Sequence, residues 1–184
     1  MTPDEMLKKL KDEQKEFARL SELVNRYKLE IPPIRAIWDT SPESLEFCSI
    51  NPDCPEVQNG VTIYTCSRED LFNGFKSNHA QVHRGKIMWG NKKNNHKIAM
   101  VIEAWEQGRK ISPVFILKTS GRRKPQVVDG HHRLTVAEKI EAPTIPIVVQ
   151  GLKPSWVKKA FKTATLECEV LRDEMMRHLS RKRD

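Results

Sequence analysis

The sequence lacks an apolar run long enough to cross a bilayer, for which a helix needs about 20 residues. Its first residues also lack the basic and apolar regions of a secretory signal peptide. Cysteine is scarce, and no two of the four cysteines have the C-x-x-C spacing of a zinc site or redox motif. These absences argue against a transmembrane protein and a zinc-bound domain. We therefore expect a cytoplasmic protein whose thiols are reduced.

Charge, by contrast, is abundant and unbalanced. The chain has 32 Lys and Arg against 24 Asp and Glu, which gives a net charge of +8. A basic surface favours a polyanionic partner, and DNA is the partner that we expect. The basic residues that we predict to bind DNA surround one predicted hairpin turn: Lys118, Arg122, Arg123 and Lys124.

Hydrophobic residues make up only 38% of the 184 residues, so we expect a compact core with solvated extensions. Apolar residues recur at three- and four-residue spacing over 4–29 and over 154–180, which predicts an amphipathic helix at each end. The chain then divides into an N-terminal helix with a proline-rich connection (1–60), a core (61–150) and a basic C-terminal helix (151–184), together one globular unit.

Within the core, strand patterns and helix patterns alternate. This order predicts a small mixed β-sheet of the α+β or α/β class, with helical extensions at both ends. The predicted core elements are a strand at 61–66, a helix at 68–75, a helix at 95–107, strands at 111–117 and 125–129, a helix at 131–141 and a strand at 144–149.

The segment 127–134, VVDGHHRL, is the most informative part of the chain. It predicts a buried strand that ends at Gly130 and leads directly into a helix. The first backbone N–H groups of a helix lack partners within it, and the helix dipole makes this end positive. A glycine lets an anion approach the backbone, and His131, His132 and Arg133 add donors. We therefore predict a phosphate pocket into which Arg133 points, with Asp129 at its edge.

A tight turn is the alternative interpretation of this segment. Asp129 would then cap the helix, Gly130 would adopt a positive φ, and the two histidines would be solvated. The two interpretations differ in whether the polar groups of the turn bind a ligand or one another.

A catalytic phosphate site would need an acid and a group that transfers protons. Asp129 is the candidate carboxylate for Mg²⁺ or Mn²⁺, and Glu103 on the preceding helix is a second candidate ligand. His131 and His132 are candidates for proton transfer, because histidine titrates near neutral pH. We therefore name Asp129, His131 and His132 as candidate catalytic residues.

The run VVDGHHRLTVAEKIEAPTIPIVV over 127–149 also resembles the signature of the ParB/sulfiredoxin superfamily. The strand pattern at 111–117 and the helix pattern at 94–106 resemble the elements before that signature, and the similarity covers about 61–150. The resemblance implies that Gly130, His132 and Arg133 bind the phosphate groups of a nucleotide, with Lys97 at the position of a phosphate-binding lysine. His131 stands where sulfiredoxin has its reactive cysteine, so thiol chemistry is excluded at this position.

Three functions are consistent with these observations. The first is a nucleotide-binding phosphohydrolase, an ATPase with metal-dependent DNase activity. Fertility-inhibition members of the superfamily imply partners in a conjugative or T-DNA transfer system. The second is a small-molecule phosphotransferase similar to a free-serine kinase, favoured by the Asp before Gly130. The third is a non-catalytic DNA-binding nucleotide switch, although the sequence shows no helix-turn-helix after the core.

Overall fold

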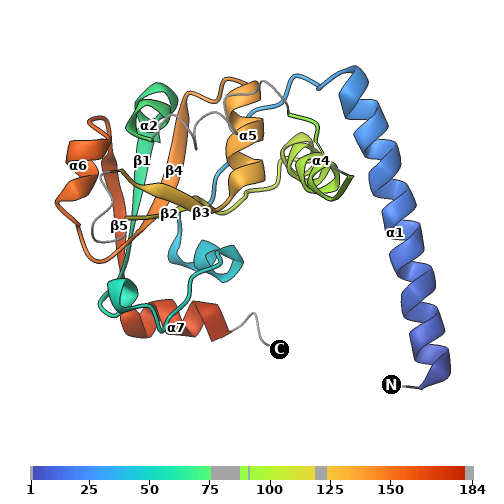
Figure 1. Ribbon diagram of the computed structural model, residues 1–184, viewed down its shortest axis with the longest axis horizontal. Helices are drawn as coiled ribbons and strands as arrows, with labels where there is room; N and C mark the ends of the chain where they lie inside the picture. The colour runs from blue at the N-terminus through green and yellow to red at the C-terminus, as the bar shows by residue number, and fades with distance from the viewer. Residues whose placement is uncertain (1, 76–87, 91, 119–123, 181–184) are drawn as a thin grey trace.

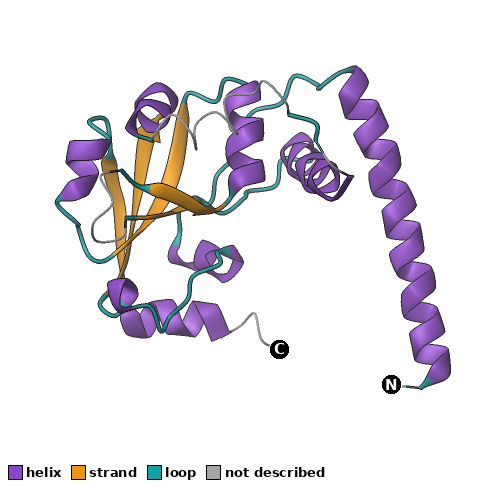
Figure 2. Ribbon diagram, in the orientation of Figure 1, coloured by secondary structure: helices purple, strands orange, loops and turns teal. Residues whose placement is uncertain are grey.

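The computed structural model describes residues 2–75, 88–90, 92–118 and 124–180. Its centre is a five-stranded sheet in the order β3-β2-β4-β1-β5, with helices on both sides (Figures 1 and 2). The strands are β1 (Gly60–Ser67), β2 (Val114–Leu117), β3 (Gln126–Asp129), β4 (Thr144–Gln150) and β5 (Thr165–Leu171). The helices are α1 (Pro3–Leu29), α2 (Arg68–Gly74), α4 (Lys92–Glu106), α5 (His131–Lys139), α6 (Trp156–Ala160) and α7 (Arg172–Ser180), with short 3₁₀ turns η1 (Pro42–Phe47) and η2 (Pro55–Val57).

The sheet is mixed. Strand β4 lies at its centre, pairing in parallel with β2 and antiparallel with β1. Strands β3 and β5 form the edges, each antiparallel to its neighbour. The predicted class, a small mixed sheet with helical ends, is confirmed.

Alternation along the strands divides the core between the two faces of the sheet. On β4, Ile145, Ile147 and Val149 belong to the cluster that also contains residues of α2, α4 and α5. Val148 points to the other face, where η1, η2 and α7 pack. Because both faces are covered, β4 is buried from Ile145 to Gln150, and its sequence is almost continuously apolar.

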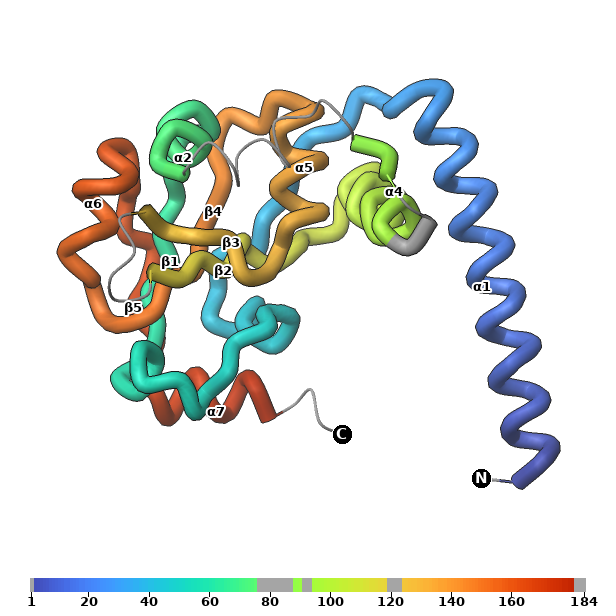
Figure 3. The backbone as a smooth tube through the Cα atoms, in the orientation of Figure 1, coloured from blue at the N-terminus to red at the C-terminus, as the bar shows by residue number. Residues whose placement is uncertain are grey.

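Helix α1 is much longer than the surface that it covers. Thr2 and Glu5 form a capping box at its start, and Val24 and Tyr27 near its end are buried in the core. Met6 and Leu10, in contrast, are more than half exposed. The first turns of α1 extend past α4 and away from the sheet (Figures 1 and 3).

The C-terminal segment corrects the prediction from sequence. The long helix expected over 154–180 is wrong, because this region folds as α6, the edge strand β5 and α7. Strand β5 pairs with β1 from Gly60↔Leu171 to Thr65↔Thr165, so the sheet extends beyond the expected core boundary at 150. Thr165 and Val170 were the local signal for this strand, but the spacing of apolar residues across 156–179 suited a helix equally well.

The remaining elements lie close to where the sequence predicts them. The expected helices at 4–29 and 131–141 correspond to α1 and α5, and the expected strands at 61–66 and 144–149 correspond to β1 and β4. Among the described residues, no helix has the length and apolar character needed to span a membrane.

Candidate functional site: the turn between β3 and α5

Strand β3 leads directly into α5 through Gly130, as the sequence predicts. The prediction that this strand is buried is wrong, because β3 lies at the edge of the sheet and Val128 is exposed. Gly130 has a φ of +90° and, as the N-cap residue, has no side chain with which to cap the helix. A Cβ at this position would lie 3.0 Å from Arg133 Nε and 3.1 Å from the Cα of Val114 on β2. Glycine is therefore required by both the backbone conformation and the close approach of β2.

The Asp129 carboxylate accepts hydrogen bonds from groups at and around the turn. Its Oδ1 accepts the N–H of Gly130 at 2.7 Å, and its Oδ2 accepts the N–H of Ser49 at 3.0 Å and Arg133 NH2 at 3.1 Å. Burial raises the pKa of Asp129, but Arg133 and the two backbone N–H groups outweigh it and hold the pKa below its ordinary value. The carboxylate is thus ionised and has three donors within the protein.

Arg133 is buried, with 9% of its surface exposed. It donates to the Ser112 carbonyl at 3.2 Å and to the Ser112 hydroxyl, in addition to Asp129. The expectation that Arg133 points into an open pocket is therefore wrong. The guanidinium joins the first turn of α5 to Asp129 and to the segment before β2, which the i, i+4 spacing of Asp129 and Arg133 could have signalled.

The histidines lie nearer to solvent than Arg133. His131 and His132 are both partly exposed, and His132 Nε2 lies 3.3 Å from Asn94 Oδ1 on α4. Burial lowers the pKa of His132, and the positive charge of Lys97, also on α4, lowers it further. The side chains of His132 and Asn94 thus join α5 to α4, and Asn94 is a polar contact that sequence reasoning missed.

Glu103 contacts a different part of the molecule. It is 9% exposed and binds Arg19 of α1, with Arg109 NH2 at 3.9 Å from its Oε2. These contacts place it at the α1–α4 interface, and Asp129 is not among its bonding partners. Within the described ranges, no cluster of three or more His, Cys, Asp or Glu side chains is arranged to hold a metal ion.

The predicted DNA-binding residues are described only in part. Arg122 and Arg123 lie outside the described residues. Lys118 and Lys124 line a pocket with Trp156, which sequence reasoning left without a role although it stands in a basic stretch.

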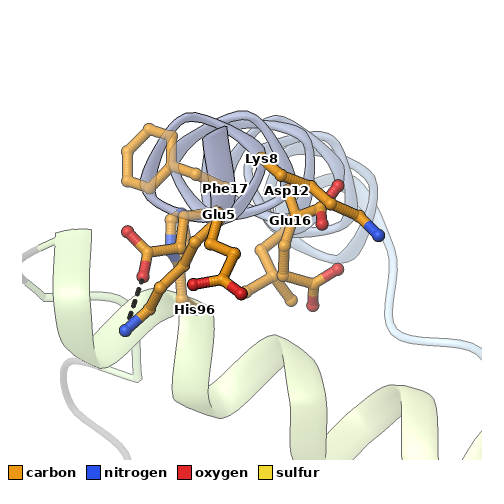
Figure 4. Close-up of a pocket in the computed structure, with 9 residues that line it drawn as sticks. Glu5, Lys8, Asp12, Glu16, Phe17 and His96 are labelled. Carbon is orange, nitrogen blue, oxygen red and sulfur yellow. Dashed lines mark ion pairs between the residues drawn. The ribbon is translucent and has the colours of Figure 1, made fainter. Parts of the chain in front are cut away.

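A larger hollow, of about 650 Å³, lies between α1 and the start of α4 (Figure 4). Both acidic and basic side chains of α1 line this hollow, and Lys9 Nζ lies 4.0 Å from Glu13 Oε1. None of the predicted site residues lines this hollow, so it is separate from the turn.

Comparisons with protein-family models, with curated proteins and with solved structures find no match for this chain.

Proposed function

We propose that the chain binds ATP or a related nucleotide through its phosphate groups at the start of α5, and that it hydrolyses the bound nucleotide. One observation carries this proposal: His132 Nε2 lies 3.3 Å from Asn94 Oδ1 of α4, about one helical turn before the exposed Lys97, beside a helix start whose N-cap residue is glycine. A helix start of this kind favours anions, and Lys97 adds a full positive charge. The resemblance to the ParB/sulfiredoxin superfamily points to the same ligand and to the same turn.

The residues at the turn have two different roles, one structural and one in phosphate binding. Asp129 and Arg133 hold the turn in shape, because each is bonded to the other and to backbone groups. Lys97, His132 and the N–H groups of α5 then bind phosphate oxygens. A neutral His132 is able to accept a proton from an attacking water, and its lowered pKa favours the neutral form near pH 7.

The two candidate carboxylates, Asp129 and Glu103, are not suited to hold a metal ion by themselves. Both oxygens of Asp129 already accept hydrogen bonds, and Glu103 is engaged by Arg19. In the proposal, Mg²⁺ or Mn²⁺ therefore arrives as the counter-ion of the nucleotide phosphates, a mode that is common for Mg²⁺. Neither Asp129 nor Glu103 is assigned as a ligand.

DNA is the proposed macromolecular partner, supported by the net charge of +8. A role in a conjugative or T-DNA transfer system follows from the resemblance alone and is the most specific part of the proposal.

A second candidate function is a nucleotide switch that binds without hydrolysis. It is favoured by the state of Asp129, the acid next to Gly130, whose two oxygens are occupied by donors of the protein. A carboxylate held in this way supports the fold of the turn and is not available as a general base.

Calorimetric titration with Mg²⁺-ATP, combined with an assay of phosphate release, tests both candidates. We expect Lys97→Ala to weaken ATP binding about 10- to 100-fold, the loss of one charge-assisted contact worth about 1.5–3 kcal/mol. Lys110→Ala is the matched control, because Lys110 is an exposed lysine that follows α4. Its affinity for ATP should equal that of the wild type.

The remaining outcomes separate the two candidates. A fall in phosphate release by His132→Asn at saturating ATP supports hydrolysis, with an expected loss of about 10²- to 10⁴-fold. Binding of ATP without phosphate release above background supports the switch. Absence of binding to ATP, ADP and CTP by the folded wild type would refute both.

A further inference from the structure

A second basic site lies where β2 ends and β3 begins, beside α6. It is a pocket of about 280 Å³, near the lower limit of about 300 Å³ for ligand pockets, so it suits one small unit of a larger ligand. Its walls come from the end of α2, the end of β2, the start of β3 and α6. The lining residues are Asn73, Gly74, Lys118, Lys124, Pro125, Trp156, Lys159 and Ala160.

The positive charge of this pocket is not balanced by acids. Three of the lining residues are lysines and none is acidic. In the part of the chain that the structure describes, no ion pair involves Lys118, Lys124 or Lys159. Lys124 has a structural contact, since its Nζ lies 3.3 Å from the Phe75 carbonyl at the end of α2. Lys118 and Lys159 are therefore the cations that can bind an anion.

Trp156 supplies an aromatic surface in the same pocket. It begins α6 and is partly exposed, with its ring edge-to-face with Phe161 at 6.3 Å between centroids. Lys118 Nζ lies 5.8 Å from the centroid of the Trp156 ring. Phe161 is fully buried and packs against Trp156. Lys118 has a long, flexible side chain, so its ammonium group can reach a phosphate beside the Trp156 ring.

We propose that this pocket binds one nucleotide of a single-stranded nucleic acid, with the base against Trp156 and its flanking phosphates on Lys118 and Lys159. Proteins that bind single strands without sequence preference combine a basic groove with aromatic side chains on which bases stack. A duplex keeps its bases stacked inside and cannot place one on Trp156. A small anion would use the lysines and leave the tryptophan without a role.

The site does not depend on the nucleotide proposed for the α5 turn. Pro125, at the pocket, precedes β3, and Asp129, at the turn, ends it, so the two sites are about 13 Å apart along the strand at about 3.3 Å per residue. Binding of single strands can be measured in EDTA, where metal-dependent hydrolysis at the turn does not occur. Lys97→Ala should leave it unchanged.

Fluorescence anisotropy with a labelled oligodeoxythymidine of about ten nucleotides tests the proposal on the full chain. We expect Lys118→Glu/Lys159→Glu to weaken binding at least about 30-fold and to reduce the salt slope of the affinity by about 0.7 for each lysine lost. Lys110→Glu/Lys139→Glu makes the same charge change at two exposed positions elsewhere and should retain most of the affinity. Equal losses in both double variants would overturn the site and indicate a general effect of net charge.

The part played by Trp156 is tested with the ligand as well as with the protein. An abasic oligonucleotide of the same length keeps the phosphates and should bind about 10-fold or more weakly, because one base–aromatic contact is lost. Trp156→Leu should bind the two oligonucleotides alike, with its melting temperature checked against the wild type. If the wild type binds the abasic strand as tightly as oligodeoxythymidine, or a duplex as tightly as either, the proposal is wrong.

Discussion

The two basic regions of this protein use their charges in opposite ways. At the start of α5, Arg133 is buried and bonded to Asp129 and Ser112, and the acid is bonded to three donors. At α6, Lys118 and Lys159 line a pocket that contains no acid. The first region has a pair whose charges cancel, and the second has lysines that form no ion pair with the acids that the structure describes.

This difference shows that a count of basic residues says little about where a polyanion binds. A buried guanidinium contributes to the net charge of +8 but is occupied within the fold. A lysine without an acidic partner contributes the same charge to the surface potential. The comparison predicts that substitutions of Gly130 or of the Asp129–Arg133 pair act mainly on stability, while substitutions at the pocket act mainly on binding.

The largest effect on stability is expected for Arg133→Ala. It leaves the Asp129 carboxylate partly buried without its cation, and breaking a buried pair in this way costs about 3–5 kcal/mol. Urea unfolding followed by circular dichroism measures the free energy of unfolding. A loss below about 0.5 kcal/mol, typical of an exposed residue, would mean that the pair does not hold the turn.

Asp129→Asn should cost less, about 1.5–3 kcal/mol at pH 7, since the amide still fills the space but no longer carries charge. The loss should also depend on pH. The pKa of Asp129 is lowered in the folded state, so its contribution is complete above its ordinary pKa and disappears as the pH falls through the folded value. The wild type and Asp129→Asn should therefore converge in stability in acid, and a difference that is constant with pH would contradict this account.

Gly130→Ala should destabilise by about 1–2 kcal/mol for the positive φ alone. The contact of the new Cβ with the Val114 backbone at 3.1 Å should add to that cost. Gly108→Ala provides the control, because Gly108 also has a positive φ but its added Cβ would meet nothing within 4 Å. Equal melting temperatures for the two variants would show that the approach of β2 has no energetic role.

The smallest effect on stability is expected for Lys118→Ala, at most about 0.5 kcal/mol, because its charged group forms no ion pair with any acid that the structure describes. The same variant should lose affinity for oligodeoxythymidine. A large loss of stability in Lys118→Ala would remove the contrast between the two regions.

Local patterns predicted the elements around the turn well. The Gly130 boundary between strand and helix was visible because glycine, the apolar run before it and the helical spacing after it each act over a few residues. Strand β5 was missed because its pairing with β1 joins residues about 100 positions apart, as in Ile63↔Cys168. A half-exposed edge strand carries no continuous apolar run that would distinguish it from a helix face.

The sequence by itself determined that an acid, a glycine, two histidines and an arginine follow one another where a strand becomes a helix. Only the tertiary structure decided which of them are available to a ligand. The backbone N–H of Ser49, the oxygens of Ser112 and the Cα of Val114 reach the turn from distant parts of the chain. A buried charge is stable only beside compensating groups. The segments that pack against the turn therefore determine that Asp129 and Arg133 bind each other, while His132 stays partly exposed against Asn94.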